Sequence, residues 1–594
     1  MQSATPLEQA RQALRAGQWD RAERLAAQVL AGAPQDWQAW HVRAVALHSL
    51  GRLGEAIDAY ARSIELGNAG AEAIAGLALA NVQGDRLEAA LAPAREAVRR
   101  SPQSAEALRI ASHCELQVGD IDTALEGWRR LESLAPPPDR WRFLRAIAWP
   151  PIMESREQIA RRFEEVDHAL DDLVARSAAL ADPAREVGMT GFYMAYQGFD
   201  DTQLQVKIAE AYRRATPSLE WQAPHVARAR TPGRKIRVGI LSRHLTNHTI
   251  GKLNIGIAQK LDRARFEVIV MRPPTEPDFL SGAFDQCAQV AVTLPPDLAA
   301  ARSKVAEAEL DALFYPDIGM DPFTYFLPFA RLARVQFTTL GHPVTTGIPN
   351  MDFFLSSRHS EPDRAQRFYH ERLVQFESLP AHFMRPRPSS SFDIRAQLGL
   401  QAGDRLYACT QTLFKVHPDF DDALVEILRR DAKGRVLLIA AKREAWNERL
   451  RRRLGRAGPD VADRIVFVPG LPLPDYLALL RDADALLDTF HFGGGCSSYE
   501  AFAMSAPVVS LPGERMRGRL TQGLYAQMGV SRWLARSADD FVRLALELAQ
   551  DKGQRGEWGR EIREGAERFI DNDAVVREYE EFIAAAVGGA LTRE

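Results

Sequence analysis

Three consecutive glycines lie between an apolar run and a segment with a helical pattern. The segment HFGGGCSSYEAFAM (491–504) follows ADALLDT and precedes SAPVVSLPGE. Glycine permits close approach of the main chain to a ligand, and a helix N-terminus favours negative charge. We therefore expect Gly493, Gly494 and Gly495 to form a loop that brings main-chain N–H groups to an anion such as a phosphate. The alternative is a tight strand–helix turn that binds nothing.

Polar side chains follow these glycines at the start of the expected helix. Ser497 and Ser498 can cap the helix or donate to phosphate oxygens, and Glu500 on the first turn can accept from sugar hydroxyls. The segment is not a Walker loop, because no Gly-Lys-Ser or Gly-Lys-Thr follows, and it lacks the GxGxxG pattern of a dinucleotide-binding first strand. It therefore predicts a phosphate site of another kind.

The elements that must position this loop alternate between strands and helices. Apolar strands such as KIRVGILS, FEVIVMR and DALFYPD follow residue 235, and a second series (DRLYACTQ, GRVLLIAA, RIVFVPG, ADALLDT) begins near 404. This alternation predicts mostly parallel sheets, whose ligands bind beyond the carboxyl ends of the strands. A stretch rich in Pro and Ser, 382–393, indicates a linker. We predict two Rossmann-like lobes, 231–388 and 389–594, the second ending in C-terminal helices.

The N-terminal part is repetitive. Glycines recur at spacings of 34, 33 and 35 residues, and an alanine follows each of them five residues later. This pattern resembles the tetratricopeptide repeat, a helix–turn–helix unit that stacks into an α-solenoid with a concave groove. We predict such a solenoid over 1–136, followed by a helical connector over 137–230. The groove would bind a protein, or the repeats would be a structural spacer. The residues are Gly17, Gly51, Gly84 and Gly119, with Ala22, Ala56, Ala89 and Ala124.

Composition excludes several classes of protein. Of the 594 residues, 75 are Lys or Arg and 78 are Asp or Glu, so the basic surplus of a general nucleic-acid binder is missing. The four cysteines are scattered without a CxxC pair, which argues against a disulfide framework or a zinc site. We expect no membrane span, because no run of 18 apolar residues occurs. With no apolar signal segment at the start, we expect a cytoplasmic protein.

Three long motifs carry a resemblance to a known family. They are LFKVHPDFD, LDTFHFGGGCSSYEAFAMSAPVVSLPGERMRGRLTQGLYAQMGV and TTLGHPVTTGIPNMDFFLSS. Together they resemble the O-linked N-acetylglucosamine transferase/SPINDLY-type family, glycosyltransferase family 41, over about 235–580. The resemblance implies a two-lobed GT-B-type fold. It also implies an inverting transfer from a nucleotide-diphosphate sugar, usually UDP-GlcNAc, that needs no metal and no cofactor.

The resemblance also implies roles for individual residues. His248, in TNHTIG, matches a histidine near the acceptor site, where a neutral imidazole could assist deprotonation. Lys415, in LFKVHP, matches a lysine that meets the donor diphosphate. Gln411 lies one position away from a donor-binding glutamine, and Tyr476 replaces a uracil-stacking histidine. The remaining donor-side candidates are Cys496 and Ser497 for the diphosphate, Glu500 for the ribose, and His491 and Arg517.

A second loop, GHPVTTG (341–347), is expected to face the donor sugar or the acceptor. Its candidate residues are His342, Pro343, Thr345 and Thr346.

The family resemblance implies a protein O-glycosyltransferase acting on Ser or Thr hydroxyls of a protein held by the repeats. Two alternatives come from family relatives. One is an asparagine N-glucosyltransferase. The other is a bacterial flagellin glycosyltransferase that uses another activated sugar, such as a CMP-linked nonulosonic (pseudaminic) acid. A third alternative, of a different class, is a repeat scaffold with an inactive transferase fold. The presence of His248, Lys415 and the glycine loop argues against that third alternative.

Overall fold

The computed structural model describes residues 5–176, 178–387, 390–551 and 553–591, and its chain divides into two compact units. The first unit comprises 1–151 with 443–446, and the second comprises 152–442 with 447–594. The predicted boundary between the lobes, at 388 and 389, falls outside the described residues. Among the described residues, no helix combines the length and the apolar character needed to cross a membrane.

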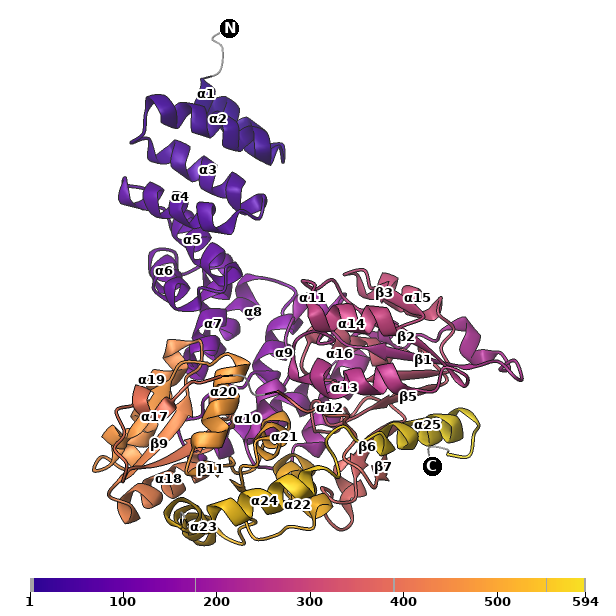
Figure 1. The fold of residues 1–594 in the computed structure, drawn as a ribbon. Coiled ribbons are helices and arrows are strands. Elements are labelled where there is room, and N and C mark those ends of the chain that lie inside the picture. The colour runs from indigo at the N-terminus through magenta and orange to yellow at the C-terminus, as the bar shows by residue number, and fades with distance from the viewer. Residues whose placement is uncertain (1–4, 177, 388–389, 552, 592–594) are drawn as a thin grey trace. The chain divides into compact units, whose positions relative to one another are not determined.

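Within the described part of residues 1–151, the first unit has nine α-helices, and each packs against the next along the chain (Figure 1). This arrangement confirms the predicted α-solenoid of helical repeats. Its helices are α1 (Pro6–Arg15), α2 (Trp19–Gly32), α3 (Trp37–Ser49), α4 (Leu53–Glu65), α5 (Ala71–Gln83), α6 (Leu87–Arg100), α7 (Ala105–Val118), α8 (Ile121–Leu134) and α9 (Asp139–Ile147).

The repeat period is more regular in the structure than the glycines indicate. The left-handed turn residue of the third repeat is Asp85 (φ 56°), because Gly84 ends α5 at φ −82°. The predicted Ala89 is accordingly exposed, and Ala90 takes the buried position between the helices. Both series now repeat every 34 residues: Gly17, Gly51, Asp85 and Gly119 at the turns, and Ala22, Ala56, Ala90 and Ala124 at 0% exposure.

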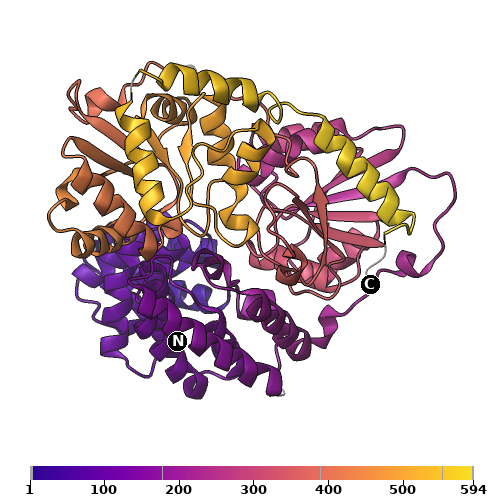
Figure 2. The same cartoon turned by 90° about the horizontal axis from the view of Figure 1, so that it is seen from below.

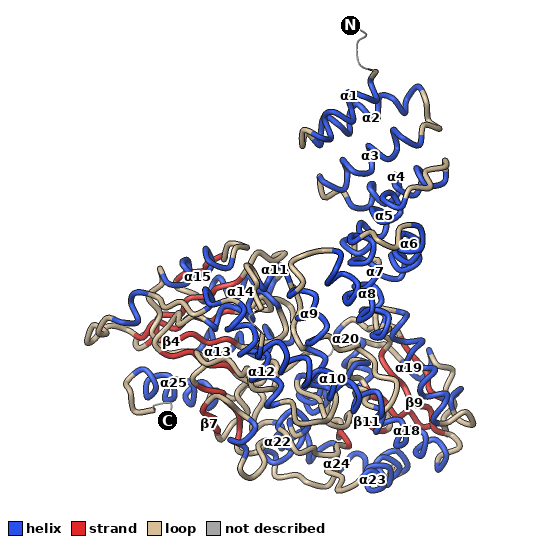
Figure 3. Tube along the Cα trace, turned by 180° about the vertical axis from the view of Figure 1, so that it is seen from behind, coloured by secondary structure: helices blue, strands red, loops and turns tan. Residues whose placement is uncertain are grey.

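The second unit contains two parallel sheets, seen as two separate groups of strands in Figure 3. The first has the order β3-β2-β1-β4-β5-β6-β7, and every pairing in it is parallel. Its strands are β1 (Ile236–Leu241), β2 (Phe266–Arg272), β3 (Val290–Thr293), β4 (Ala312–Tyr315), β5 (Val335–Thr338), β6 (Phe353–Ser357) and β7 (Arg372–Phe376). Helices α13 (Thr249–Lys260), α14 (Phe279–Cys287), α15 (Leu298–Ala306) and α16 (Pro322–Phe326) connect them.

The second sheet has the order β10-β9-β8-β11-β12 and is also parallel throughout. Its strands are β8 (Arg405–Cys409), β9 (Gly434–Ile439), β10 (Ile465–Val468), β11 (Ala485–Leu487) and β12 (Val508–Val509). Its helices are α17 (Ile394–Gln397), α18 (Pro418–Arg430), α19 (Glu444–Ala457), α20 (Leu473–Asp482), α21 (Cys496–Ala503), α22 (Leu520–Met528), α23 (Ala538–Gln550) and α24 (Arg555–Ala566). The two sheets confirm the predicted pair of α/β lobes.

The last helix, α25 (Ala574–Val587), returns to the first lobe. Tyr579 and Phe582 lie in one buried cluster with Phe337 and Phe353 of the first sheet. Figure 2 shows this yellow helix lying across the strands of that sheet. The structure therefore differs from the expected second lobe over 389–594, because burial of the apolar face of α25 places it with residues 231–388.

Much of the expected connector packs on the lobes. After α10 (Arg156–Ala175) come a short helix, α11 (Pro183–Glu186), and a 3-10 turn, η1 (Phe192–Tyr196). Helix α12 (Thr202–Ala215) packs against α10. Two further 3-10 turns, η2 (Pro217–Leu219) and η3 (Pro224–Ala227), lead into β1. Main-chain hydrogen bonds join Ala223 N–H to Arg331 O and Arg331 N–H to Trp221 O, so this end of the connector is fixed to the first lobe.

The docking of α25 can be tested by substitution at Phe582. Its ring contacts those of Phe337 (5.1 Å between centroids) and Phe353 (5.3 Å). We expect Phe582→Ala to cost about 3–5 kcal/mol of stability, as for other buried aromatic truncations, and to lower the melting temperature. Glu581→Ala, at the neighbouring exposed position, is the matched control and should change stability by less than about 0.5 kcal/mol. Equal melting temperatures for the two variants would contradict the docking.

Candidate active site

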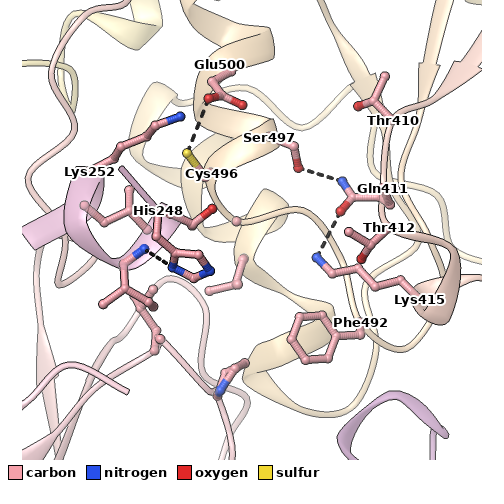
Figure 4. Close-up of a pocket in the computed structure, with 18 of the residues that line it drawn as sticks. His248, Lys252, Thr410, Gln411, Thr412, Lys415, Phe492, Cys496, Ser497 and Glu500 are labelled. Carbon is pink, nitrogen blue, oxygen red and sulfur yellow. Dashed lines mark hydrogen bonds between the residues drawn. The ribbon is translucent and has the colours of Figure 1, made fainter. Parts of the chain in front are cut away.

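A cavity of about 560 Å³ lies between the two lobes of the second unit. Most of its lining comes from segments that follow β1, β4, β5, β8, β10 and β11, so it lies beyond the carboxyl ends of the strands, as parallel sheets predict. Figure 4 shows its polar side chains converging from both lobes. Of the predicted site residues, nine line it: His248, Pro343, Gln411, Lys415, Tyr476, Gly495, Cys496, Ser497 and Glu500.

The glycine loop is held by the protein's own acceptors. Gly493 N–H donates to Arg517 O (2.8 Å), and Gly494 N–H donates to Asp488 Oδ1 (2.7 Å). These two main-chain groups are therefore not available to a ligand, contrary to the expectation for all three glycines. The N–H groups of Cys496 and Ser497 begin α21 and have no intrahelical acceptor, and both residues line the cavity.

Asp488 is the acceptor that organises this loop. The residue is buried at the end of β11, and its Oδ2 accepts from Ser510 Oγ (2.9 Å) and Thr521 Oγ1 (2.7 Å). Burial raises the pKa of the Asp488 carboxyl, while these donors and the nearby Lys415 favour its charged form. One carboxylate thus joins the glycine loop, the end of β12 and helix α22.

Neighbouring side chains also explain why positions 493 and 494 are occupied by glycine. A Cβ on Gly493 would lie 2.7 Å from Asp488 Oδ2, and one on Gly494 would lie 2.4 Å from Ser498 Oγ and 2.8 Å from Gln411 Nε2. A Cβ on Gly495 would meet only Leu520 Cδ1, at an ordinary 3.7 Å. Gly495 is the glycine of the three that lines the cavity and has room for a side chain.

Lys415 is the cation at this side of the cavity. Its Nζ donates to Gln411 Oε1 (2.9 Å) and to Gly493 O (3.0 Å), and Gln411 Nε2 donates to Ser497 Oγ (2.7 Å; Figure 4). Burial lowers the pKa of Lys415 to about 8, and the Asp488 carboxylate opposes that shift. The ammonium is therefore still largely charged at neutral pH, and a bound anion would raise its pKa further.

His248 lies on the opposite wall, at the N-cap of α13. Its Nδ1 accepts from Ile250 N–H (3.2 Å), and its ring stacks on His244 with 4.4 Å between centroids. Burial lowers the pKa of His248 to about 4, so the imidazole is neutral at physiological pH. Because Nδ1 is the acceptor, the proton of the neutral ring lies on Nε2. In this tautomer His248 is a hydrogen-bond donor, which differs from the base implied by the family resemblance.

Further polar groups in the lining are those of Tyr476, Cys496 and Glu500. Tyr476 OH lies 3.2 Å from Thr410 Oγ1. Cys496 Sγ donates to Glu500 Oε1 at 3.6 Å. Burial raises the pKa of Glu500, and Lys252 across the cavity opposes that shift. The thiol of Cys496 is protonated, because burial raises its pKa well above the usual value.

The loop 341–347 brings fewer side chains to the cavity than the sequence predicted. His342 is buried and stacks on Phe192, with 5.2 Å between ring centroids. Thr345 Oγ1 donates to Glu371 Oε2 (2.6 Å), and Thr346 N–H donates to Glu371 Oε1 (2.7 Å). The structure does not bring His342, Thr345 or Thr346 to the cavity, because these interactions hold them in the interior of the first lobe.

Three donor-side candidates also lie behind the cavity wall. Arg517 forms a buried ion pair with Asp201 (2.8 Å) and donates to Phe199 O, and Ser498 Oγ donates to Gly494 O (3.2 Å). His491 Nε2 lies 2.6 Å from Asp419 Oδ2. These residues support the loop and its packing on the connector, and the structure does not place them in the cavity.

His491, Asp419 and His417 form a group whose ligand atoms lie within 4.8 Å of one another. This geometry alone would suit a metal ion. However, His417 Nδ1 already accepts from Asp419 N–H (3.1 Å), and Asp419 is paired with Arg156. The group does not line the cavity, so we assign it a structural role.

Several cavity residues were not predicted from the sequence. Phe192 and Tyr196 reach the cavity from the connector, and Thr410 reaches it from the end of β8. Lys252 lies one helical turn after His248, so the i, i+4 spacing of the two residues on one helix could have indicated it.

Comparisons with known proteins agree with this architecture. Residues 7–71 match the model of the tetratricopeptide repeat, and residues 387–565 match that of glycosyl transferase family 41. A solved O-GlcNAc transferase mutant from Thermobaculum terrenum aligns over 99% of this chain and 98% of its own, with TM-score 0.55 and 22% identity. That likeness confirms the fold: helical repeats followed by a two-lobed glycosyltransferase.

The curated relatives match a smaller part of this chain. A probable UDP-N-acetylglucosamine--peptide N-acetylglucosaminyltransferase SPINDLY from Eustoma exaltatum subsp. russellianum is 26% identical over 37% of this chain and 24% of its own length. A UDP-glucose:protein N-beta-glucosyltransferase from Actinobacillus pleuropneumoniae serotype 5b (strain L20) is 26% identical over 43% and 41%. The chain thus spans between a quarter and two-fifths of these relatives. It carries tetratricopeptide repeats and a domain of glycosyl transferase family 41.

The contrast between Gly494 and Gly495 generates a prediction. Gly494→Ala forces Ser498, Gln411 or the loop to move, so we expect a loss of about 1–3 kcal/mol, typical of overpacking. Gly495→Ala should leave the melting temperature unchanged, because its Cβ meets only an ordinary contact.

Thermal unfolding of the two variants, alongside titration calorimetry with UDP, checks the contrast. We expect Gly495→Ala to weaken nucleotide binding while it keeps the wild-type melting temperature. If Gly494→Ala melts at the wild-type temperature, the close approach of Gln411 and Ser498 does not explain this glycine.

Proposed function

We propose that this protein is a protein O-glycosyltransferase that moves a sugar from a nucleotide-sugar donor of the UDP-GlcNAc type to Ser or Thr hydroxyls. The observation that carries the proposal is the network of Lys415, Gln411 and Ser497 at the start of α21, inside a cavity between two parallel α/β lobes. A cation and a helix N-terminus that meet at one point form a site for a phosphate group. The family 41 match over 387–565 supports the same assignment.

The reaction would place negative charge on the leaving nucleotide. The oxygen of the acceptor hydroxyl attacks the anomeric carbon with inversion, the bond between that carbon and the phosphate oxygen breaks, and the hydroxyl proton passes to a phosphate oxygen of the departing nucleotide. Lys415 and the N–H groups at the start of α21 would stabilise the charge that develops on the departing diphosphate. This stabilisation requires neither a metal nor a cofactor, and the cavity would hold donor and acceptor in the geometry for attack.

His248 would act in this reaction by donating a hydrogen bond. Its Nε2–H lies on the wall opposite Lys415, where it could hold an oxygen of the donor sugar or the acceptor. With a pKa of about 4, the ring is a weak proton acceptor for an alcohol at neutral pH. The proposal therefore gives His248 an orienting role at the reacting atoms.

The acceptor is a protein in this proposal, because the chain carries tetratricopeptide repeats, whose concave surfaces bind polypeptides. Transfer to asparagine is a second candidate, favoured by the similarity to the UDP-glucose:protein N-beta-glucosyltransferase. A flagellin acceptor with a CMP-linked acidic sugar as donor remains the alternative implied by the family resemblance.

Transfer is tested with the purified full-length protein, a panel of UDP- and CMP-sugars and proteins from its native cell. We expect an intact-mass increase of one sugar from a UDP-sugar, and peptide mapping should locate it on Ser or Thr. Lys415→Gln should lower the rate about tenfold or more, because a charge-assisted contact to the leaving group is lost. Excess EDTA should leave the rate unchanged. Loss of transfer on chelation, restored by manganese, would contradict the metal-free assignment.

Two substitutions at His248 distinguish a role as hydrogen-bond donor from a role as general base. Asparagine is a good N-cap, so His248→Asn keeps the hydrogen bond from Ile250 N–H but is too short to replace Nε2–H. Glutamine can place an amide N–H near the position of Nε2. We therefore expect kcat/KM of His248→Gln to exceed that of His248→Asn by about tenfold or more, because only glutamine can replace the hydrogen bond from Nε2–H. Equal, complete inactivity of both, with a wild-type rate that follows a histidine titration, would indicate a base.

A further inference from the structure

A buried polar pair lies behind His248, in the interior of the first lobe. His244 follows β1 and Asp317 follows β4, and these two strands lie side by side in the first sheet. His244 Nε2 lies 3.9 Å from Asp317 Oδ2, which is too long for a hydrogen bond. Among the described residues, no other basic side chain lies within 4.0 Å of the Asp317 carboxyl. The two residues are therefore each other's nearest ionisable partner.

The rest of the protein leaves the facing atoms of this pair without hydrogen bonds. Asp317 is 1% exposed, and neither of its carboxyl oxygens has a hydrogen-bond partner in the described part of the chain. Nε2 of His244 is likewise buried and unpartnered there. Such atoms are rare in proteins, because burial removes water without compensation. A small approach of the imidazole to the carboxyl would satisfy both groups at once.

The pair retains a proton at neutral pH. Burial raises the pKa of the Asp317 carboxyl to about 8; Asp321 adds to that shift and the nearby Ser242 hydroxyl opposes it. Burial also lowers the pKa of His244, with Asp321 opposing and Arg243 adding to the shift. Arg243 and Asp321 are themselves paired at 2.6 Å, so their charges largely cancel. Below about pH 8, Asp317 and His244 therefore share one proton and carry no net charge as a pair.

A ring stack connects the pair to the cavity. His244 stacks on His248 with 4.4 Å between centroids and 28° between the ring planes. Burial is the main cause of the low pKa of His248, and His244 and Lys252 lower it further. The two imidazoles thus interact both by contact and through their charges. Asp317, His244 and His248 form a row that runs from the interior of the lobe to the cavity wall.

We propose that Asp317 and His244 are positioning residues for His248. By sharing one proton, the pair fixes the ring plane of His244, and the stacked ring of His248 is fixed with it. His248 then keeps its neutral form and the direction of its Nε2–H. The inference rests on the proposed transferase function, in which His248 donates a hydrogen bond at the reacting atoms. It adds two residues that do not line the cavity themselves.

Three variants test this role. Asp317→Asn removes the ionisable carboxyl at nearly constant size, and His244→Phe keeps a ring for the stack but removes Nε2. Tyr325→Phe is the matched control, because it removes another buried and unpartnered oxygen from the same lobe, in a cluster with Phe326 and Phe329. Melting temperature and titration calorimetry with UDP show whether each variant is folded and binds nucleotide.

The kinetic test is a double-mutant cycle with His248. Asp317→Asn and His244→Phe should each lower kcat/KM for transfer about tenfold, with UDP affinity as in the wild type. Both effects should largely disappear in the His248→Gln background, because the ring through which the two residues act is then absent. The double variant of Asp317→Asn and His244→Phe should be no slower than the slower single variant. Tyr325→Phe should match its parent in either background.

Two further measurements do not depend on transfer. In NMR of isotope-labelled histidine side chains, the His248 signal is assigned by its loss in His248→Gln. This signal should shift in Asp317→Asn and in His244→Phe, but not in Tyr325→Phe. A raised pKa in the folded state stabilises the fold at low pH, and this contribution is lost as the pH rises toward 8. The melting temperature of Asp317→Asn, relative to the wild type, should therefore rise between about pH 4 and pH 8.

Two results would overturn the inference. One is an unchanged kcat/KM in both Asp317→Asn and His244→Phe. The other is an equal loss of kcat/KM with histidine or glutamine at position 248, since the effect would then not pass through that ring. A wild-type protein that transfers no sugar from any UDP- or CMP-sugar would overturn the proposed function instead. In that case the NMR shifts of His248 would still test the contact with the pair.

Discussion

The buried carboxylate of Asp488 is the constraint on which the geometry of the cavity depends. It accepts three hydrogen bonds, from Gly494 N–H, Ser510 Oγ and Thr521 Oγ1, and so fixes the glycine loop between β11 and α21. A buried carboxylate is stable only when hydrogen bonds and a nearby cation compensate for lost water. Lys415 supplies that cation, and it in turn holds Gln411 against Ser497. The carboxylate that holds the glycine loop and the ammonium that lines the cavity are therefore parts of one network.

The second constraint is the position of the two lobes relative to each other, which contacts with the connector fix. Arg517 of the second lobe forms a buried ion pair with Asp201, and Arg453 of the second lobe pairs with Asp421 and donates to Met153 O. The same connector is hydrogen-bonded to the first lobe through Arg331. Breaking either buried pair would leave an uncompensated charge, which is costly. The connector thus helps to shape the cavity, to which it also contributes Phe192 and Tyr196.

Sequence patterns predicted the elements well and the site in part. Parallel sheets, helical repeats and the start of α21 follow from periodicity and glycine spacing, which are local signals, whereas Lys415 and His248 were expected only from the family resemblance. Thr345, His491 and Arg517 were misplaced because their partners, Glu371, Asp419 and Asp201, are distant in the chain. A polar residue in a loop has the same sequence signal whether it faces a ligand or a buried carboxylate. The register of the third repeat failed for a local reason, since Asp85 replaces glycine at the left-handed turn.

The difference between a ligand and a protein neighbour also explains the role of the three glycines. A glycine triplet indicates that something lies close to the main chain, but not whether that neighbour is a ligand or the protein. Here Asp488, Ser498 and Gln411 occupy the space beside Gly493 and Gly494, while Gly495 faces the cavity with room to spare. The first two glycines therefore allow the loop to close around Asp488, and this closure aligns the first N–H groups of α21 with Lys415. Because the N–H groups of Gly493 and Gly494 are bonded within the protein, these two glycines would act on a phosphate indirectly, by setting the direction of the helix that follows them.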